Sequence, residues 1–224
     1  MRQLALALTQ PPEPSLDNFV AGPNAELVER LRDAARGAKG ESVIYLWGAP
    51  GSGRTHLLRA TAGAARDARY AGAQDDLAGI AARLVAVDDV ERLDEARQIA
   101  LFNLINRARA AGGDAGGVVL AAGNAPPAQL ALRADLTSRL GWGLVYELRA
   151  PDDADKALHL RAEARRRGLE LSDEVLAYLL ARLPRDLRSL VAIVELLDRH
   201  SLERRRPLTV PLAREALREA DRQA

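Results

Sequence analysis

The segment SVIYLWGAPGSGRT, residues 42–55, contains the pattern that decides the fold. Residues 42–47 are mostly β-branched, aliphatic or aromatic, and a short apolar run that ends at a glycine predicts a buried strand. Residues 48–55 fit the phosphate-loop pattern G-x-x-x-x-G-K-[ST] except at position 54. In that pattern, backbone N–H groups and the N-terminus of the following helix converge on phosphate oxygens. The segment therefore predicts a nucleotide site between a strand and a helix over about residues 55–66; a glycine-rich turn without ligand is the alternative.

The phosphate-loop pattern carries an arginine, Arg54, where it normally has a lysine. A lysine is a compact point charge, whereas a guanidinium is planar and binds bidentately. We expect Arg54 to hold phosphate in an altered geometry, which favours nucleotide binding over fast hydrolysis. Gly48, Gly51 and Gly53 would shape the loop, and the Thr55 hydroxyl would bind Mg²⁺.

Further strands and helices alternate along the first two thirds of the chain. Apolar runs predict strands over residues 84–87, 117–122 and 144–148, and amphipathic segments predict helices over 24–36, with Asn24 as N-cap, and 94–111. Strands that alternate with helices form a parallel sheet with helices on both faces. The sequence thus predicts an α/β nucleotide-binding domain.

Polar residues follow two of these strands. Asp88 would act on Mg²⁺ through its water shell, and Asp89 would orient the attacking water. Asn124 would position water or a γ-phosphate oxygen. The alternatives are acidic residues that cap the next turn and an ordinary turn asparagine.

From Pro151 onward the pattern becomes wholly helical. Helical periodicity covers residues 152–167, 172–182, 186–200 and 211–220, and no strand pattern appears. Ser172 is suited to cap the second of these helices. A second, all-helical domain is therefore expected over residues 151–224.

The composition excludes several other kinds of protein. The 224 residues include no cysteine and three widely separated histidines, which argues against disulfide frameworks, thiolate chemistry and histidine metal sites. A net charge of +1 provides no strong field toward nucleic acid or membranes. The apolar runs are far shorter than the roughly 18–20 residues of a membrane span. We expect a soluble cytoplasmic protein.

Several specific stretches resemble one known family. They are Phe19–Asn24, Thr55–Leu58, Val87–Glu91, Ser138–Leu144 and Leu187–Leu190. Together they resemble the AAA+ ATPase module of the replication initiator DnaA, and within that group the Hda family of DnaA regulatory inactivators. The resemblance implies an AAA+ P-loop parallel sheet with flanking helices over residues 16–150, followed by a small helical lid.

Three features favour the Hda family over the initiators. The chain stops after the lid, and it has arginine in the phosphate loop. Its leader, residues 1–15, begins with a peptide that is similar to the family's motif for the β sliding clamp of DNA polymerase III. In that peptide Gln3 would bond to a pocket rim and Leu4, Leu6 and Leu8 would fill apolar pockets. A tail with chance leucines is the alternative, and Ala7 stands where a proline is typical.

The resemblance also implies roles for single residues. Arg139 would be an arginine finger that acts in trans on ATP held by DnaA, Arg188 a sensor-2 arginine touching bound nucleotide, and Phe19 and Asn24 neighbours of the adenine. The short segment 56–84 implies that the family's usual strand and helix there are reduced to residues 69–71 and 75–82.

The expected function is therefore negative regulation of replication initiation. The protein would bind ADP, or ATP, with Mg²⁺, attach to the sliding clamp, and stimulate hydrolysis of ATP on DnaA near the nucleoid and replisome. An autonomous AAA+ ATPase or helicase-loader-like motor and a non-catalytic adaptor are the alternatives. Whether the protein forms homo-oligomers stays open. The basic groups at Arg161, residues 165–167 and residues 204–206 are either solvent-facing charge or a contact with DNA.

Overall fold

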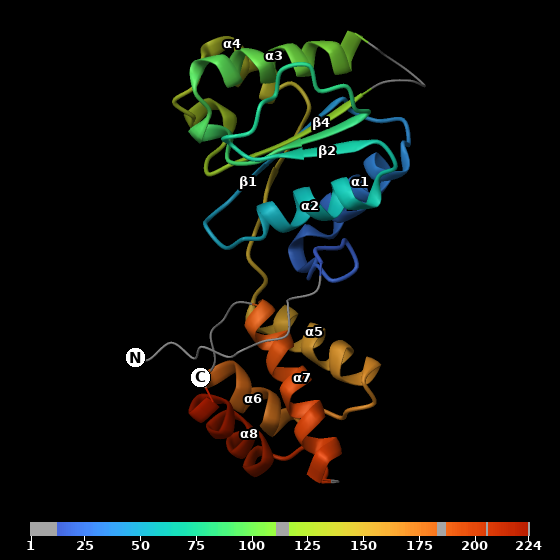
Figure 1. Cartoon of the computed structure of the whole chain (residues 1–224), viewed down its shortest axis with the longest axis vertical. Helices are drawn as coiled ribbons and strands as arrows, with labels where there is room; N and C mark the ends of the chain where they lie inside the picture. Colours follow the sequence, from blue (N-terminus) through green and yellow to red (C-terminus); the bar gives the residue numbers. More distant parts are fainter. Residues whose placement is uncertain (1–12, 111–116, 183–186, 205, 224) are drawn as a thin grey trace. The chain divides into compact units, whose positions relative to one another are not determined.

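A five-stranded, fully parallel sheet forms the centre of the first unit of the chain (Figure 1). The computed structural model describes residues 13–110, 117–182, 187–204 and 206–223, and for residues 182, 187–191 and 220–223 the backbone only. The described chain divides after Ala150 into two compact units, each of which is considered by itself.

The strand order brings the phosphate-loop strand next to the centre of the sheet. The strands are β1 (Val43–Trp47), β2 (Ala68–Ala71), β3 (Leu84–Val87), β4 (Val118–Gly123) and β5 (Leu144–Glu147). They run in the order β2-β3-β4-β1-β5. Because all strands are parallel, the loops after β3, β4 and β1 leave the sheet at one edge, on neighbouring strands.

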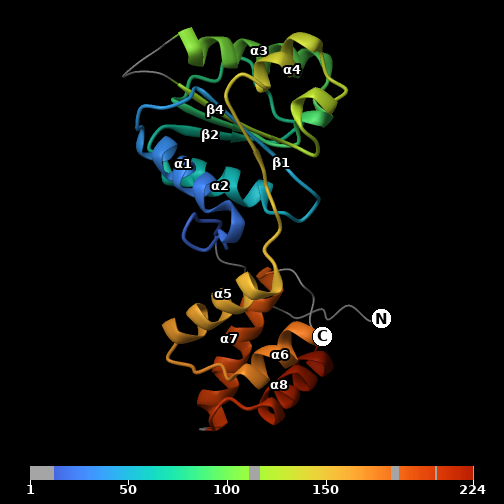
Figure 2. The same ribbon diagram turned by 180° about the vertical axis from the view of Figure 1, so that it is seen from behind.

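Helices cover both faces of this sheet, as predicted (Figures 1 and 2). The helices are α1 (Ala25–Arg36), α2 (Arg54–Ala64), α3 (Glu95–Ala110) and α4 (Ala134–Leu140), with short 3-10 turns η1 (Gly22–Asn24), η2 (Val90–Arg92) and η4 (Pro127–Gln129). The α1 and α2 helices lie on one face and α3 and α4 on the other.

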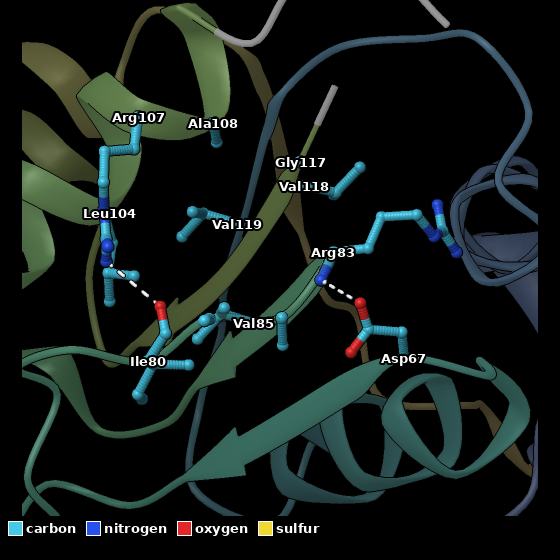
Figure 3. Close-up of a pocket in the computed structure, with 12 residues that line it drawn as sticks. Asp67, Ile80, Arg83, Val85, Leu104, Arg107, Ala108, Gly117, Val118 and Val119 are labelled. Carbon is cyan, nitrogen blue, oxygen red and sulfur yellow. Dashed lines mark hydrogen bonds between the residues drawn. The ribbon is translucent and has the colours of Figure 1, made fainter. Parts of the chain in front are cut away.

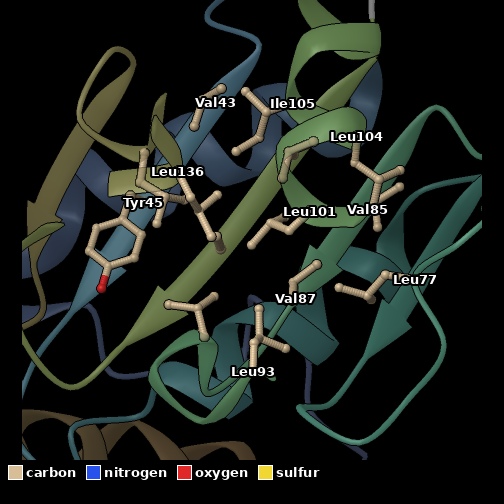
Figure 4. Packing of buried hydrophobic residues seen from close by; sticks show 14 of the residues in the cluster. Val43, Tyr45, Leu77, Val85, Val87, Leu93, Leu101, Leu104, Ile105 and Leu136 are labelled. Carbon is tan, nitrogen blue, oxygen red and sulfur yellow. The ribbon is translucent and has the colours of Figure 1, made fainter. Parts of the chain in front are cut away.

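The alternation of side chains along β1 explains the two covered faces. Val43 and Tyr45 pack with α3 and α4, while Ile44 and Leu46 pack with α1 and α2 (Figure 4). All four are almost completely buried. A strand buried on both faces reads as a continuous apolar run, which is why β1 was visible in the sequence.

The segment between α2 and β3 corrects one expectation. A strand does form there, β2, but residues 75–82 form turns and no helix. The carboxylates of Asp75 and Asp76 accept bonds from the backbone N–H groups of Gly72 and Ala78, at 2.8 Å each. Such local bonds compete with helix formation.

The second unit contains four helices and no strand in its described residues. They are α5 (Asp153–Arg166), α6 (Asp173–Arg182), α7 (Leu187–Arg204) and α8 (Val210–Gln223). A capping box between Asp152 and Asp155 begins α5, and the Ser172 hydroxyl accepts a bond from the N–H of Val175 at 3.3 Å, which confirms the expected cap. Its core includes Leu160, Val175, Leu179, Ile193, Val194, Leu197, Ala213 and Ala216.

Candidate functional site

The loop between β1 and α2 has the backbone of a phosphate loop. Gly51 and Gly53 have φ angles of +80° and +103°, a region that side chains other than glycine rarely adopt. A Cβ on Gly48 would lie 2.6 Å from the carbonyl oxygen of Leu148. The three glycines are therefore required by the shape of the loop, which is what the sequence pattern predicted.

The N-terminus of α2 is open for an anion. No side chain caps this 11-residue helix, and its first intrahelical bond runs from the N–H of Leu57 to the oxygen of Gly53 at 3.0 Å. The preceding N–H groups of the first turn, including those of Arg54 and Thr55, are the groups that bind phosphate in such helices. Thr55 is exposed at this position.

Phe19 lies directly against the loop. A Cβ on Gly53 would be 2.8 Å from the Phe19 ring, and that ring is 5.6 Å from the His56 ring, centre to centre. His56 Nε2 in turn lies 3.0 Å from the carbonyl oxygen of Ser15, so residues 13–15 already belong to the folded unit. The expected neighbourhood of Phe19 and the bound adenine stays a prediction.

The Arg54 side chain is partly buried in the first unit. One of its terminal nitrogens is buried without a hydrogen-bond partner in the described structure. Burial raises the pKa of Tyr45 above its usual range; the nearby Glu91 carboxylate raises this pKa further and the Arg54 guanidinium opposes the rise. The Tyr45 hydroxyl donates to the oxygen of Ala125, in the segment after β4, at 2.7 Å. A buried donor without a partner is a group that a phosphate would satisfy.

Asp88 is oriented by a residue that the sequence analysis missed. It is 3% exposed, and its carboxylate accepts bonds from the Tyr70 hydroxyl and from the N–H of Asp89, both at 3.0 Å. Tyr70 lies on β2, beside β3, and nothing local in the sequence marks it. The next residue, Asp89, has a φ of +49°, a strained conformation that is concentrated at functional sites.

The parallel sheet brings the expected catalytic residues together. Asp88 follows β3, Asn124 follows β4 and the phosphate loop follows β1, and these three strands are neighbours. Asn124 is exposed there. The edge thus combines an anion site with a carboxylate and an amide, the groups that bind a magnesium nucleotide.

Asn24 has a different partner from the one expected. Its side chain is 4% exposed, its Nδ2 donates to the oxygen of Arg149 at 2.8 Å, and its Oδ1 accepts from the N–H of Arg149 at 3.0 Å. It makes no cap bond to α1, which corrects that prediction. Both polar ends of the amide are thus used on the backbone just before the second unit begins.

Arg139 lies at the opposite edge of the sheet from the phosphate loop. It belongs to the last turn of α4, and a Cβ on Gly143, just before β5, would lie 2.0 Å from the oxygen of Val43, the first residue of β1. The five residues of β1 separate this edge from the loop by about 16 Å. The structure therefore does not bring Arg139 to the chain's own phosphate loop.

Other expected residues stand apart from this arrangement. Gln3, Leu4, Leu6 and Leu8 lie outside the described residues, and Arg188 lies in α7 with its side chain not described. In the basic groups, carboxylates pair with Arg161, Arg166, Arg167 and Arg204. This pairing favours the solvated-charge interpretation over a DNA surface.

A cavity of about 350 Å³ lies at the amino edge of the sheet, away from the phosphate loop (Figure 3). Its charged groups are already engaged. The N–H of Arg83 donates to Asp67 at 3.0 Å, the Arg83 guanidinium donates to the oxygens of Ala34 and Ala35, and Arg107 donates to the oxygen of Ile80 at 3.1 Å. The cavity therefore offers no free charge to a ligand.

In its described part, the chain has no helix that could cross a membrane and no cluster of three or more His, Asp or Glu side chains able to hold a metal ion.

Known structures share this fold at low sequence identity. AMPPCP-bound DnaA from Aquifex aeolicus is 24% identical over 86% of this chain and 67% of that one, with a TM-score of 0.69. Domain III of Thermotoga maritima DnaA is 21% identical over 95% and 98%, with a TM-score of 0.68. The RuvB Holliday junction branch migration motor of Thermotoga maritima is 19% identical over 93% and 72%, with a TM-score of 0.64.

The first unit thus has the AAA+ fold that these DnaA and RuvB structures share, as predicted. Residues 153–217 match the family model described as "Hda, lid domain". The helical unit is thus similar to the lid domain of Hda proteins, and the first unit shares its fold with DnaA.

Proposed function

We propose that this protein is a negative regulator of replication initiation that stimulates hydrolysis of ATP bound to DnaA. It holds a nucleotide, ADP in preference to ATP, with Mg²⁺ as a structural ligand. It is attached to the β sliding clamp by its leader and acts in the cytoplasm at the replisome. Its Arg139 then reaches the phosphates of ATP on DnaA.

The geometry of the carboxyl edge supports the nucleotide. The uncapped start of α2, the three required glycines and the unpartnered nitrogen of Arg54 together form an anion site. The strained backbone at Asp89, beside a buried and doubly bonded Asp88, fits a magnesium side of that site. Arg54 in place of lysine favours a resident nucleotide over rapid turnover.

The position of Arg139 is the observation that carries the proposal. Arg139 lies at the far edge of the sheet, and the roughly 16 Å length of β1 separates that edge from the phosphate loop, so Arg139 does not reach a nucleotide there. Its guanidinium pairs with no carboxylate among the described residues, so it is available to a phosphate on another molecule. An arginine finger supplied in trans contributes roughly 10³–10⁵ in rate.

Two other functions use the same fold. An autonomous AAA+ ATPase, including a helicase-loader-like motor, would hydrolyse ATP at its own phosphate loop with Asp89 and Asn124 as catalytic groups. A non-catalytic adaptor would bind DnaA without accelerating hydrolysis. The autonomous ATPase would release phosphate from its own phosphate loop, and the adaptor would leave phosphate release by DnaA unchanged.

The experiment measures phosphate release by this protein alone, by DnaA alone, and by both with DNA-loaded clamp. The Arg139→Ala variant should fold and bind nucleotide normally, yet lose the stimulation. Arg139→Lys should restore little, because a point charge does not reproduce a guanidinium fork. Arg36→Ala is the matched control, since Arg36 is exposed and pairs only with Asp33 on its own helix in the described structure.

The loss should appear in the maximal rate and much less in the affinity for DnaA, because a finger acts mainly in the transition state. Full stimulation by Arg139→Ala would contradict the trans mechanism and favour the adaptor. Turnover near 1 s⁻¹ or above by this protein alone, at the low end of ordinary enzyme rates, would favour the autonomous ATPase.

A further inference from the structure

Two guanidinium groups share one tryptophan ring at the amino edge of the sheet. The guanidinium carbon of Arg139 lies 3.4 Å from the centre of the Trp142 ring, and that of Arg109 lies 4.5 Å from the same centre. Arg139 is also 5.4 Å from the centre of the Phe102 ring. Three elements meet here: Arg109 and Phe102 come from α3, Arg139 from α4, and Trp142 from the turn before β5.

This arrangement leaves two positive charges without a carboxylate. In the described part of the chain no acidic side chain pairs with Arg109 or Arg139, whereas Arg97 on α3 and Arg133 before α4 each pair with an aspartate. Two like charges held on one ring repel each other, and an anion that binds beside both would offset that repulsion. The cluster therefore favours a ligand that carries several negative charges.

Contact with the ring is compatible with further bonds from the guanidinium donors. A cation–π contact uses the face of a guanidinium, so the N–H groups in its plane stay available for bidentate bonds to phosphate oxygens. The Nε of Arg139 is buried without a partner, which shows how closely the neighbouring side chains surround this arm. Trp142 itself is 49% exposed, so the cluster is open to another molecule.

We propose that Trp142 is the positioning residue of Arg139, and that Arg109 on the same ring provides a second guanidinium for the terminal phosphates of a nucleoside triphosphate held by the partner. This proposal rests on the proposed function and extends the trans site from one residue to three. The rigid indole holds the Arg139 side chain in its binding conformation before the partner arrives. Without the ring, fixing that conformation on binding would cost entropy.

The experiment compares Trp142→Ala, Trp142→Phe and Arg109→Ala with Arg139→Ala in the stimulated hydrolysis of ATP by DnaA. Both the maximal rate and the protein concentration for half-maximal stimulation are measured. Loss of the ring should lower the maximal rate roughly 2- to 30-fold, the range that corresponds to one cation–π contact, and leave the half-maximal concentration nearly unchanged. Trp142→Phe should recover part of that loss, because a phenyl face also attracts a cation.

Arg109→Ala should likewise lower the maximal rate, while Arg107→Ala is its matched control. Arg107 lies two residues earlier on α3, so its replacement removes the same charge. Its guanidinium donates to the oxygen of Ile80, whereas the guanidinium groups described on the Trp142 ring are those of Arg109 and Arg139. Thermal unfolding and ADP binding should be unchanged in Arg109→Ala and Trp142→Phe, which separates a positioning role from a structural one.

The outcomes distinguish the two proposals. Loss of stimulation in Arg139→Ala together with full stimulation in Trp142→Ala and Arg109→Ala would overturn the three-residue site and leave the single finger intact. Full stimulation in Arg139→Ala would overturn both. An equal loss in Arg107→Ala and Arg109→Ala would reduce Arg109 to general surface charge and would contradict its assigned role.

Discussion

Replacement of Asn24 by alanine tests how the first unit holds the segment that leads to the lid. The variant loses both hydrogen bonds to the backbone of Arg149, at 2.8 and 3.0 Å, from a side chain that is 4% exposed. Each such bond contributes about 0.5–1.5 kcal/mol net. Because Arg149 is itself exposed, water can partly replace the lost partners, and we expect a loss of about 1–3 kcal/mol in the free energy of unfolding.

The assay is denaturant unfolding followed by far-UV circular dichroism, with thermal unfolding as a second measurement. The midpoint temperature should fall by on the order of 5 °C. Asn103→Ala is the control, since Asn103 is an exposed residue inside α3 and its replacement should shift stability by less than about 0.5 kcal/mol. Equal stability of the Asn24 and Asn103 variants would refute the argument from the two bonds.

The same variant tests whether Asn24 acts only through its two bonds to the Arg149 backbone or also contacts the adenine. If Asn24 acts only on Arg149, saturating ADP with Mg²⁺ should stabilise the variant and the parent protein by the same increment. An increment of about 2.7 kcal/mol is expected when the ligand is at 100 times its Kd. Loss of this increment in the variant would instead support the adenine contact that the family resemblance implies.

Three other changes test separate parts of the molecule. Gly53→Ala should abolish ADP binding, measured by calorimetry. The loop requires a φ near +103°, which alanine rarely adopts, and the new Cβ would lie 2.8 Å from the Phe19 ring; retained affinity would contradict the loop assignment. Gln3→Ala with Leu4→Ala should abolish clamp binding in a pull-down and leave thermal unfolding unchanged, while unchanged clamp binding would remove the tether. Burial alone would raise the pKa of Glu163, but its bond to Arg167 holds that pKa below the usual value. Glu163→Gln should therefore cost stability at pH 7. The difference from the parent protein should shrink as the pH falls below the ordinary glutamate pKa and through the lower pKa of the folded chain, where the carboxyl becomes protonated in both folded and unfolded chains; a difference that persists once the folded carboxyl is protonated would contradict the ion pair.

Local sequence determined much of the candidate site. The apolar run of β1, the glycines after it and the polar residues after β3 and β4 are each set within a few residues of chain, since strand formation, positive φ angles and helix initiation depend on near neighbours. The helical periodicity after Pro151 likewise predicted the lid. Residues 75–82 were misjudged because aspartate side chains bond to nearby backbone there, a competition that periodicity does not report. The helix α4 was not anticipated, since seven residues are too few for a clear period.

Only the tertiary structure decided which distant side chains meet. The Tyr70 hydroxyl on Asp88, the Asn24 amide on Arg149, and the guanidinium groups of Arg109 and Arg139 on one indole ring all join separate elements. Such contacts depend on strand order and helix packing, which arise from the burial of whole faces and leave no periodic signal in the chain. The sequence by itself therefore determined the phosphate loop and its fold class, whereas the packing of α3 and α4 against the sheet determined that Arg139 lies on an aromatic ring, at the opposite edge from that loop.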